Sequence, residues 1–232
     1  MTAVGLLDDL YSGPERGWRA HLASGGTTGV VELTAVPLAA DDWPGWRGPH
    51  RDGVWSETKI LESFPAGGLE VRWRAPVGVG FSSPVVAQGR VYVTDSEVVR
   101  PRARERIHAF EAPTGKPCWS HAFDLDYPEW AFDEKNPFGP SATPIVADGR
   151  IYSLGAVGHL TCCDALKGSV LWKRDLSREH PGKELQCRAS PLIEGDFLIV
   201  FVGAQPAACV IGLDKVTGKE AWTALSEQAR PS

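Results

Sequence analysis

The chain lacks the short motifs of nucleophilic and metal-dependent enzymes. Its 232 residues contain no Gly-x-Ser-x-Gly sequence, no His-Glu-x-x-His sequence and no glycine-rich loop of the phosphate-binding type. The six histidines are scattered, and the five cysteines have neither the spacing of zinc ligands nor the even number of a disulfide framework. We therefore predict no catalytic residue and no metal site of these classes.

Long apolar runs are missing as well. Residues 30–40 resemble the end of a signal peptide, but Glu32 and Pro37 interrupt them, so the sequence predicts neither a secretory nor a membrane-spanning segment. We expect residues 1–41 to be an unplaced, disordered N-terminal segment. Two origins stay open for it: a native leader lost through an incorrect start or a sequence error, and an ordinary flexible extension.

Charge and composition restrict the partners. A net charge of −5 argues against nucleic acid or an anionic membrane surface as a partner. With 43% hydrophobic and 23% charged residues, the chain has enough apolar content to form the core of a soluble globular protein.

An 11-residue pattern, small–x–acid–x–x–x–Gly–x–x–x–Trp, occurs three times. From the frequencies of acidic residues, glycine and tryptophan, chance predicts roughly 0.1 occurrences of the acid–Gly–Trp core, so three copies indicate a repeat. The copies are AFEAPTGKPCW at 109–119, CCDALKGSVLW at 162–172 and GLDKVTGKEAW at 212–222.

Each copy follows two short runs that have the composition of β-strands. These upstream runs are SSPVVAQGRVYV from Ser82, SATPIVADGRIYSL from Ser141 and ASPLIEGDFLIVFV from Ala189. Their β-branched and aromatic residues, separated by glycine-containing turns, predict β-hairpins. The repeated tryptophans lie 53 and 50 residues apart, the period of a four-stranded propeller blade. The predicted fold is therefore an all-β propeller of four-stranded antiparallel blades, with units at about 82–123, 141–176 and 189–226.

These spans resemble the tryptophan-docking repeats of quinoprotein-type β-propellers, the PQQ-binding-like repeat family. In that family the tryptophan packs between a glycine peptide of the neighbouring blade and a small residue. The resemblance assigns this structural role to Trp119, Trp172, Trp222, Gly115, Gly168 and Gly218, with Ala109, Cys162 and Gly212 as the small residues. Residues 42–53, DWPGWRGPHRDG, are similar to the start of the propeller in bacterial secreted or periplasmic members. The resemblance covers residues 42–232 and implies a periplasmic or secreted location.

The number of repeats is small for a closed ring. Family members usually have eight blades, and three full units are visible here, preceded by a lone strand at 69–74 that carries Trp73. We expect a partial ring of about three blades from a longer protein. In the family's layout the lone strand would complete the last blade of the ring.

The adjacent cysteines Cys162 and Cys163 have two interpretations. In quinoprotein alcohol dehydrogenases a vicinal disulfide lies against the cofactor, and the resemblance makes this pair a candidate cofactor-binding site. The repeat register offers the alternative, because the pair aligns with Ala109-Phe110 and Gly212-Leu213, which are ordinary third-strand positions.

Residues 97–106, EVVRPRARER, depart from the repeat where a tight hairpin is expected. Four arginines suit an anion or an acidic partner, whereas a solvated loop, partly neutralised by its own glutamates, is the alternative. The arginines are Arg100, Arg102, Arg104 and Arg106.

Residues 124–140, DLDYPEWAFDEKNPFGP, are the second departure and join the first two units. Interleaved carboxylates and aromatics suit sugar or calcium binding, although the spacing is not that of an EF-hand. A loop held to the surface by its aromatic side chains is the alternative.

The leading functional hypothesis is a non-catalytic β-propeller scaffold that binds a protein or a polysaccharide. The alternative is a fragment of an alcohol or sugar dehydrogenase dependent on PQQ and calcium, with Cys162 and Cys163 near the quinone. The calcium ligands and the aspartate base of such enzymes cannot be matched to residues of this chain. We also expect Trp119, Trp172 and Trp222 to be largely buried at equivalent places in successive sheets.

Overall fold

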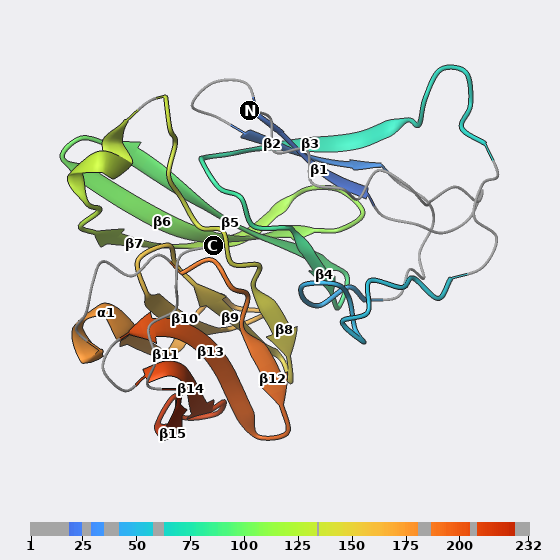
Figure 1. Cartoon of the computed structure of the whole chain (residues 1–232). Helices are drawn as coiled ribbons and strands as arrows, with labels where there is room; N and C mark the ends of the chain where they lie inside the picture. Colours follow the sequence, from blue (N-terminus) through green and yellow to red (C-terminus); the bar gives the residue numbers. More distant parts are fainter. Residues whose placement is uncertain are drawn as a thin grey trace.

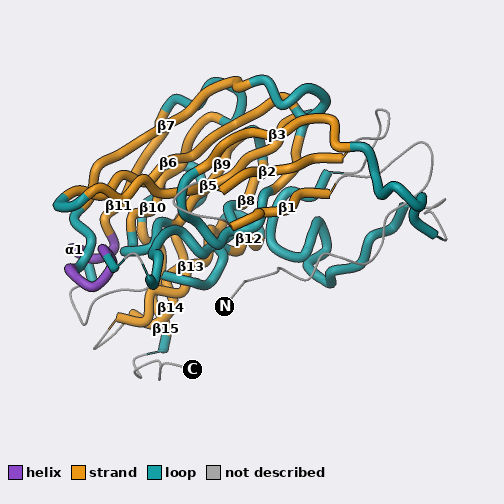
Figure 2. The backbone as a smooth tube through the Cα atoms, turned by 90° about the horizontal axis from the view of Figure 1, so that it is seen from above, coloured by secondary structure: helices purple, strands orange, loops and turns teal. Residues whose placement is uncertain are grey.

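A computed structural model of the chain describes residues 19–24, 29–34, 42–57, 63–133, 135–180, 187–204 and 208–225. Over these residues the fold is all-β, as predicted, with four antiparallel sheets following one another along the chain (Figure 1). Helical structure in the described part is limited to a 3-10 turn, η1 (Glu129–Phe132), and one short helix, α1 (Leu176–Glu179). Figure 2 shows how strands dominate, with α1 at the edge of the molecule.

Three of the sheets are four-stranded meanders, which we call blades 1 to 3. In each, the strands pair in the order in which they occur in the chain. Blade 1 contains β4 (Val85–Ala87), β5 (Arg90–Val99), β6 (Arg102–Glu111) and β7 (Pro117–Leu125). Blade 2 contains β8 (Ile145–Ala147), β9 (Arg150–Leu154), β10 (His159–Asp164) and β11 (Val170–Asp175). Blade 3 contains β12 (Leu192–Glu194), β13 (Phe197–Ala204), β14 (Ala208–Asp214) and β15 (Glu220–Ala224).

The turns between the first two strands of blades 1 and 2 follow from their sequences. Gln88-Gly89 and Asp148-Gly149 join strands through two residues with positive φ, between 50° and 72°. This is the backbone of a two-residue hairpin turn, in which asparagine, aspartate and glycine are favoured because left-handed conformations cost them least.

The fourth sheet corrects one prediction. Residues 1–41 were predicted to be an unplaced, disordered segment, but its two described parts, β1 (Arg19–Ser24) and β2 (Gly29–Thr34), pair with β3 (Val71–Val77) in the order β1-β2-β3. The lone tryptophan-bearing strand therefore obtains its partners from the N-terminal segment. Pairing satisfies backbone groups that would otherwise remain open along one edge of β3.

A bulge recurs at the same position in all four sheets. The residue opposite each repeated tryptophan is the last one before the register shifts, at Ala109 opposite Trp119, Cys162 opposite Trp172 and Gly212 opposite Trp222. Leu33 stands opposite Trp73 at the same shift in the first sheet. The sheet built on the N-terminal segment thus reproduces the third and fourth strands of a blade.

Neighbouring sheets share apolar cores. β3 packs on blade 1 through a cluster that includes Trp73, Ala75 and Val91. Blades 1 and 2 meet in a cluster that includes Tyr92, Ile107 and Ile151. Blades 2 and 3 share the largest cluster, formed by Tyr152, Leu154, Leu160, Cys162, Leu198, Val200, Ile211 and Leu213 among others. Burial of these faces between sheets is the main stabilising contribution of the arrangement.

None of the described helices has the length and apolar character needed to span a membrane.

Candidate functional site

Each sheet contacts the next through a tryptophan on its last strand. The indole Nε1 donates a hydrogen bond to a carbonyl oxygen in the following sheet, and the ring lies on a glycine three residues after that carbonyl. The pairs are Trp73 with Ala112 O (3.0 Å) and Gly115, Trp119 with Ala165 O (3.0 Å) and Gly168, and Trp172 with Lys215 O (3.3 Å) and Gly218.

Glycine is required at these three positions for two reasons. Gly115, Gly168 and Gly218 have φ between 70° and 72°, a left-handed conformation that costs other residues about 1–2 kcal/mol. A β-carbon there would also lie 2.3 to 2.6 Å from the nearest atom of the indole ring. The spacing of glycine and tryptophan in the repeat therefore encodes a contact between sheets.

The burial of the three predicted tryptophans is lower than expected. Trp119, Trp172 and Trp222, each on the last strand of its blade, are only partly buried. Trp73, which lies outside the three full repeats, is more buried at 8% exposure. Trp222 lies close to Gly212 of its own sheet, where a β-carbon would come within 2.0 Å of the indole.

Cys162 and Cys163 are free thiols at ordinary strand positions. Successive residues of a strand point to opposite faces, and Cys162 packs in the core between blades 2 and 3, whereas Cys163 packs between blades 1 and 2. Burial raises the pKa of each thiol to about 12, so both are protonated at neutral pH. Cys118 and Cys187 are also free.

The arginine-rich segment 97–106 is not a loop, which corrects that alternative. β5 and β6 continue as paired strands as far as Val99 opposite Arg102, with the turn at Arg100-Pro101. Each of these strands has ten residues, against five in β9 of blade 2. Blade 1 is therefore longer at this end than its neighbour.

Three of the four arginines in this hairpin pair with carboxylates of the same region. Arg100 contacts Glu129 (2.5 Å), Arg104 contacts Asp124 (2.7 Å), and Arg106 contacts Asp95 (2.7 Å). Exposed pairs such as the first two contribute little to stability, because water screens them. The three pairs nonetheless neutralise most of the positive charge of the hairpin, which the sequence analysis had considered as a site for an anion.

Residues 124–140 cover the long hairpin. Tyr127 and Phe138 are buried and meet edge to face, with ring centroids 5.0 Å apart, and Trp130 contacts Phe138 at 4.7 Å. Tyr127 and Phe138 form a small core with Ala103 and Leu125 under the segment, whereas Trp130 is exposed. The two departures from the repeat thus pack on each other, and we call them the blade-1 extension (residues 97–106 and 124–140).

Asp124, Glu129 and Asp133 of the extension form local contacts. Asp133 accepts hydrogen bonds from Lys135 N (2.9 Å) and Asn136 Nδ2 (2.7 Å), and Glu134 lies outside the described residues. Within the described ranges, no group of three or more His, Cys, Asp or Glu side chains is arranged to hold a metal ion. The contacts fit the alternative of a segment held in place by its aromatic side chains.

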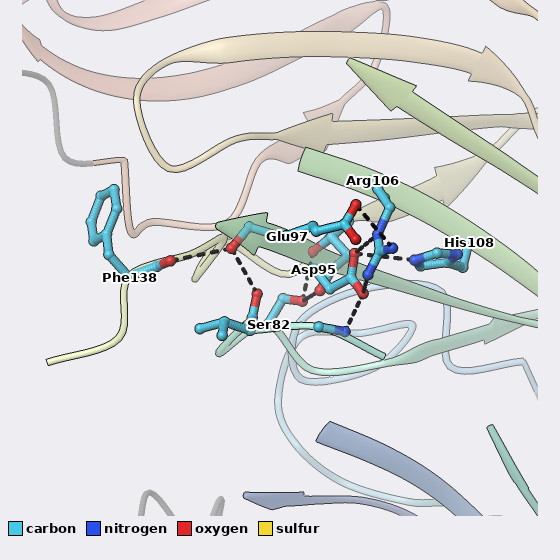
Figure 3. Close-up of polar contacts among 10 residues, drawn as sticks. Ser82, Asp95, Glu97, Arg106, His108 and Phe138 are labelled. Atoms are coloured by element: carbon cyan, nitrogen blue, oxygen red, sulfur yellow. Dashed lines mark hydrogen bonds and ion pairs between the residues drawn. The ribbon is translucent and has the colours of Figure 1, made fainter. Parts of the chain in front are cut away.

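A buried ionic network fixes the base of the long hairpin (Figure 3). Asp95 accepts two hydrogen bonds from Arg106 (2.8 and 2.7 Å) and lies 3.1 Å from His108 Nε2, and Gly78 N also donates to it. Burial alone would raise the pKa of Asp95, but the hydrogen bonds from His108 and Arg106 outweigh it and lower the pKa to about 2. The carboxylate is therefore ionised and fully paired, which makes it a structural group.

The same network ties the segment before β4 to blade 1. Ser82 Oγ lies 2.7 Å from Thr94 Oγ1, and Ser96 Oγ lies 3.1 Å from Val79 O and 3.2 Å from Phe138 O. Figure 3 shows Ser82 and Phe138 beside the Asp95 cluster. Hydrogen bonds thus connect β5, the segment before β4 and the second half of the extension.

Glu105 is a buried carboxyl group that sequence reasoning missed. It is 2% exposed and accepts hydrogen bonds from Tyr127 Oη (2.7 Å) and from Ala156 N (2.9 Å) in blade 2. Burial raises its pKa to about 7, against the opposing effect of these two hydrogen bonds. Across the described ranges, no basic side chain forms an ion pair with it, so Glu105 joins the extension to blade 2 without charge compensation.

A polar cleft of about 400 Å³ separates the extension from blade 2. Its charged lining comes from Asp124 and Asp126 on one side and from Asp175 and Arg178 on the other. His159, the first residue of β10, lies here 3.5 Å from Asp175, and burial lowers the pKa of its imidazole. The cleft can form hydrogen bonds and ion pairs with a surface that enters it.

A second cavity lies where residues 42–55, the edge segment, cross the first strands of the blades. The segment is compact: Trp43 and Trp55 stack with ring centroids 4.8 Å apart, and Gly48 lies against Trp43. Trp43 forms an isolated bridge with Val86 of β4. The edge cavity, of about 450 Å³, lies between this segment and strands β8 and β12.

Three four-stranded blades, each of which holds on a glycine the tryptophan of the preceding sheet, define a β-propeller of the PQQ-like repeat class. A family model described as "Outer membrane protein assembly factor BamB" matches residues 103–232, and the chain belongs to this family.

Individual relatives are of two kinds. The chain is 32% identical over 111 residues to the quinohemoprotein alcohol dehydrogenase ADH-IIG of Pseudomonas putida, covering 46% of this chain and 13% of that protein. It is 25% identical over 130 residues to the outer membrane protein assembly factor BamB of Kangiella koreensis, covering 56% of this chain and 30% of that protein. The chain thus spans less than a third of either relative.

Among solved structures, BamB from Moraxella catarrhalis shares the fold. It matches with a TM-score of 0.50 and 16% identity, over 89% of this chain and 51% of that chain. The predicted family and fold class are thereby confirmed. The size of the complete ring stays a prediction.

Proposed function

We propose that this chain is a non-catalytic β-propeller scaffold that acts in outer membrane protein assembly by binding a protein partner in the periplasm. The family match over residues 103–232 and the similarity to the Kangiella koreensis assembly factor support this function. We propose a protein rather than a polysaccharide as the partner, because the matched relatives of this kind are described as protein assembly factors.

The observation that carries the proposal is the construction of the blade-1 extension. Three of its four arginines are paired with carboxylates, and Tyr127 and Phe138 lie in an inner core, so the region is an ordered structural element. A rigid element that stands beyond the repeat, beside a polar cleft, suits recognition of another protein's surface.

The second candidate function is a PQQ- and calcium-dependent dehydrogenase, favoured by the Pseudomonas putida relative. It requires Cys162 and Cys163 to contact the quinone as a vicinal disulfide. Against it, the two thiols are reduced and packed in two different cores between blades.

Deletion of the gene in its own bacterium tests the proposed function. We expect the amounts of outer membrane β-barrel proteins to fall, as measured by quantitative mass spectrometry of outer membrane fractions, and to recover on complementation. Unchanged amounts would contradict the proposal. Reduction of an artificial electron acceptor by the purified chain with PQQ, Ca²⁺ and an alcohol would favour the second candidate.

A further inference from the structure

The first strands of the three blades present equivalent backbone groups at their free edge. Val86, Val146 and Ile193 are the middle residues of β4, β8 and β12, and each precedes its hairpin turn by the same number of residues. In an antiparallel hairpin of this kind the N–H and C=O of the middle residue point away from the second strand. All three residues therefore offer a donor and an acceptor to a chain lying along the edge.

The edge segment uses these groups to a decreasing extent from blade 1 to blade 3. At Val86 both groups are bonded, since Trp43 N donates to Val86 O (2.7 Å) and Val86 N donates to Trp43 O (3.0 Å). At Val146 the N–H donates to Pro44 O (2.8 Å), and no group of the described residues donates to the carbonyl. At Ile193 the carbonyl accepts from the guanidinium of Arg51 (2.5 Å), and no described group accepts from Ile193 N.

The edge cavity lies over this least occupied position. The edge segment contributes Trp46, Arg47 and Arg51 to its lining, and the blades contribute Ile145, Leu192 and Ile193 among others. Among the described residues, the lining includes two arginines and no acidic residue, although the whole chain has a net charge of −5. Trp46 is 55% exposed at the rim. The cavity thus combines an open strand edge, positive charge and an exposed aromatic ring.

We propose that the edge cavity binds an extended acidic segment of a partner protein, which accepts a hydrogen bond from β12 as Pro44 does from β8. Ile193 N donates this main-chain hydrogen bond, and the arginines select carboxylate side chains over basic ones. Trp46 covers an apolar side chain of the bound strand. The inference rests on the proposed function and places the docking site of its protein partner.

The experiment measures the fluorescence anisotropy of a fluorescein-labelled octapeptide of alternating valine and glutamate, titrated with the full chain. Two control peptides carry lysine in place of glutamate, or N-methyl groups on alternate backbone nitrogens. We expect the unmodified acidic peptide to bind at least about tenfold more tightly than either control, because the first control loses charge complementarity and the second loses strand pairing.

Two variants locate the binding. Arg51→Glu and Trp46→Ala are each expected to weaken binding at least about tenfold, whereas Arg72→Glu, at an exposed arginine of β3 outside the edge cavity, leaves it unchanged. Arg51 also holds the edge segment to Ile193, so thermal unfolding of each variant is compared with that of the wild type. Trp46 makes no such bond and gives an independent result if the Arg51 variant unfolds.

The outcomes separate this inference from the function on which it rests. Equal binding of the lysine or N-methyl peptide, absence of binding, or binding that both variants leave intact would overturn the proposed site. If gene deletion leaves outer membrane proteins unchanged while the peptide still binds in the expected pattern, the assembly role fails and the site remains.

Discussion

The indole of Trp119 lies so close to Gly168 of the next blade that a β-carbon on this glycine would come within 2.4 Å of the ring. The same indole donates its N–H to Ala165 O. One tryptophan thus both packs on the neighbouring turn and donates a hydrogen bond to its backbone. The same pair of contacts recurs along the chain.

Gly168→Ala should destabilise the fold far more than Gly149→Ala. The two glycines have nearly equal φ values, 72° and 71°, but Gly149 has open space where a β-carbon would stand. We expect about 1 kcal/mol of destabilisation for Gly149→Ala, from backbone strain, and at least about 3 kcal/mol for Gly168→Ala, from strain and overlap with Trp119. Urea unfolding of both variants measures the difference, and equal values would show that the indole can move away at no cost.

Trp119→Ala should cost about 2–4 kcal/mol of unfolding free energy. The change removes part of the core between blades 1 and 2 and leaves Ala165 O without its indole donor. Trp46→Ala is the matched control, because this side chain is 55% exposed, and its unfolding free energy should change by less than about 0.5 kcal/mol. Similar losses of unfolding free energy for the two variants, measured by urea titration, would show that Trp119 does not stabilise the contact between blades.

Glu105 should make the fold less stable as the pH rises from 5 to 8. Its pKa is about 7 in the folded state and near 4.5 when unfolded, so the folded state holds the proton more tightly. The stability from this group is complete below pH 4.5 and is lost as the pH rises through 7. Asp95, with a lowered pKa of about 2, acts in the opposite sense and only in acid, below about pH 4.

Glu105→Gln isolates that contribution, because it keeps an acceptor for Tyr127 and Ala156 but cannot ionise. Chemical unfolding at pH 5 and pH 8 should show a loss of a few kcal/mol in the wild type that is reduced in the variant. An identical pH dependence in both proteins would mean that Glu105 does not titrate in this range.

The thiols of Cys162 and Cys163 should resist modification in the folded protein. Both are buried with raised pKa values, and the reactive form of a thiol is the thiolate. We expect a thiol reagent to label them only in denaturant, and intact mass spectrometry to show no loss of two hydrogens. Detection of a vicinal disulfide in the native protein would support the cofactor interpretation instead.

The repeat was predictable because its residues are tied to backbone geometry. Gly115, Gly168 and Gly218 are glycines because the turn there is left-handed. The tryptophan four residues after a glycine packs on the corresponding glycine of the following sheet, where there is one. Such local constraints survive in a single sequence, so the number and order of the blades could be inferred from spacing alone.

The long hairpin was missed although a signal for it was present. Arg102, Arg104 and Arg106 alternate with buried Ala103 and Glu105, which is the two-residue period of a strand. The strand was not predicted because Glu105 occupies a buried position, and a glutamate in the sequence indicates an exposed one. The pairing of the N-terminal strands with β3 is a long-range contact with no glycine–tryptophan signature of its own, and composition alone could not reveal it.

The most direct test of a non-catalytic scaffold is complementation of the deletion strain by Cys162→Ala. Alanine fits this position, since Ala109 occupies the equivalent place in blade 1. The scaffold account predicts that the variant, at wild-type abundance, restores the amounts of outer membrane proteins as fully as the wild type does. A folded and equally abundant variant that fails to restore them would contradict the account. That result would mean that the function requires the thiol of Cys162.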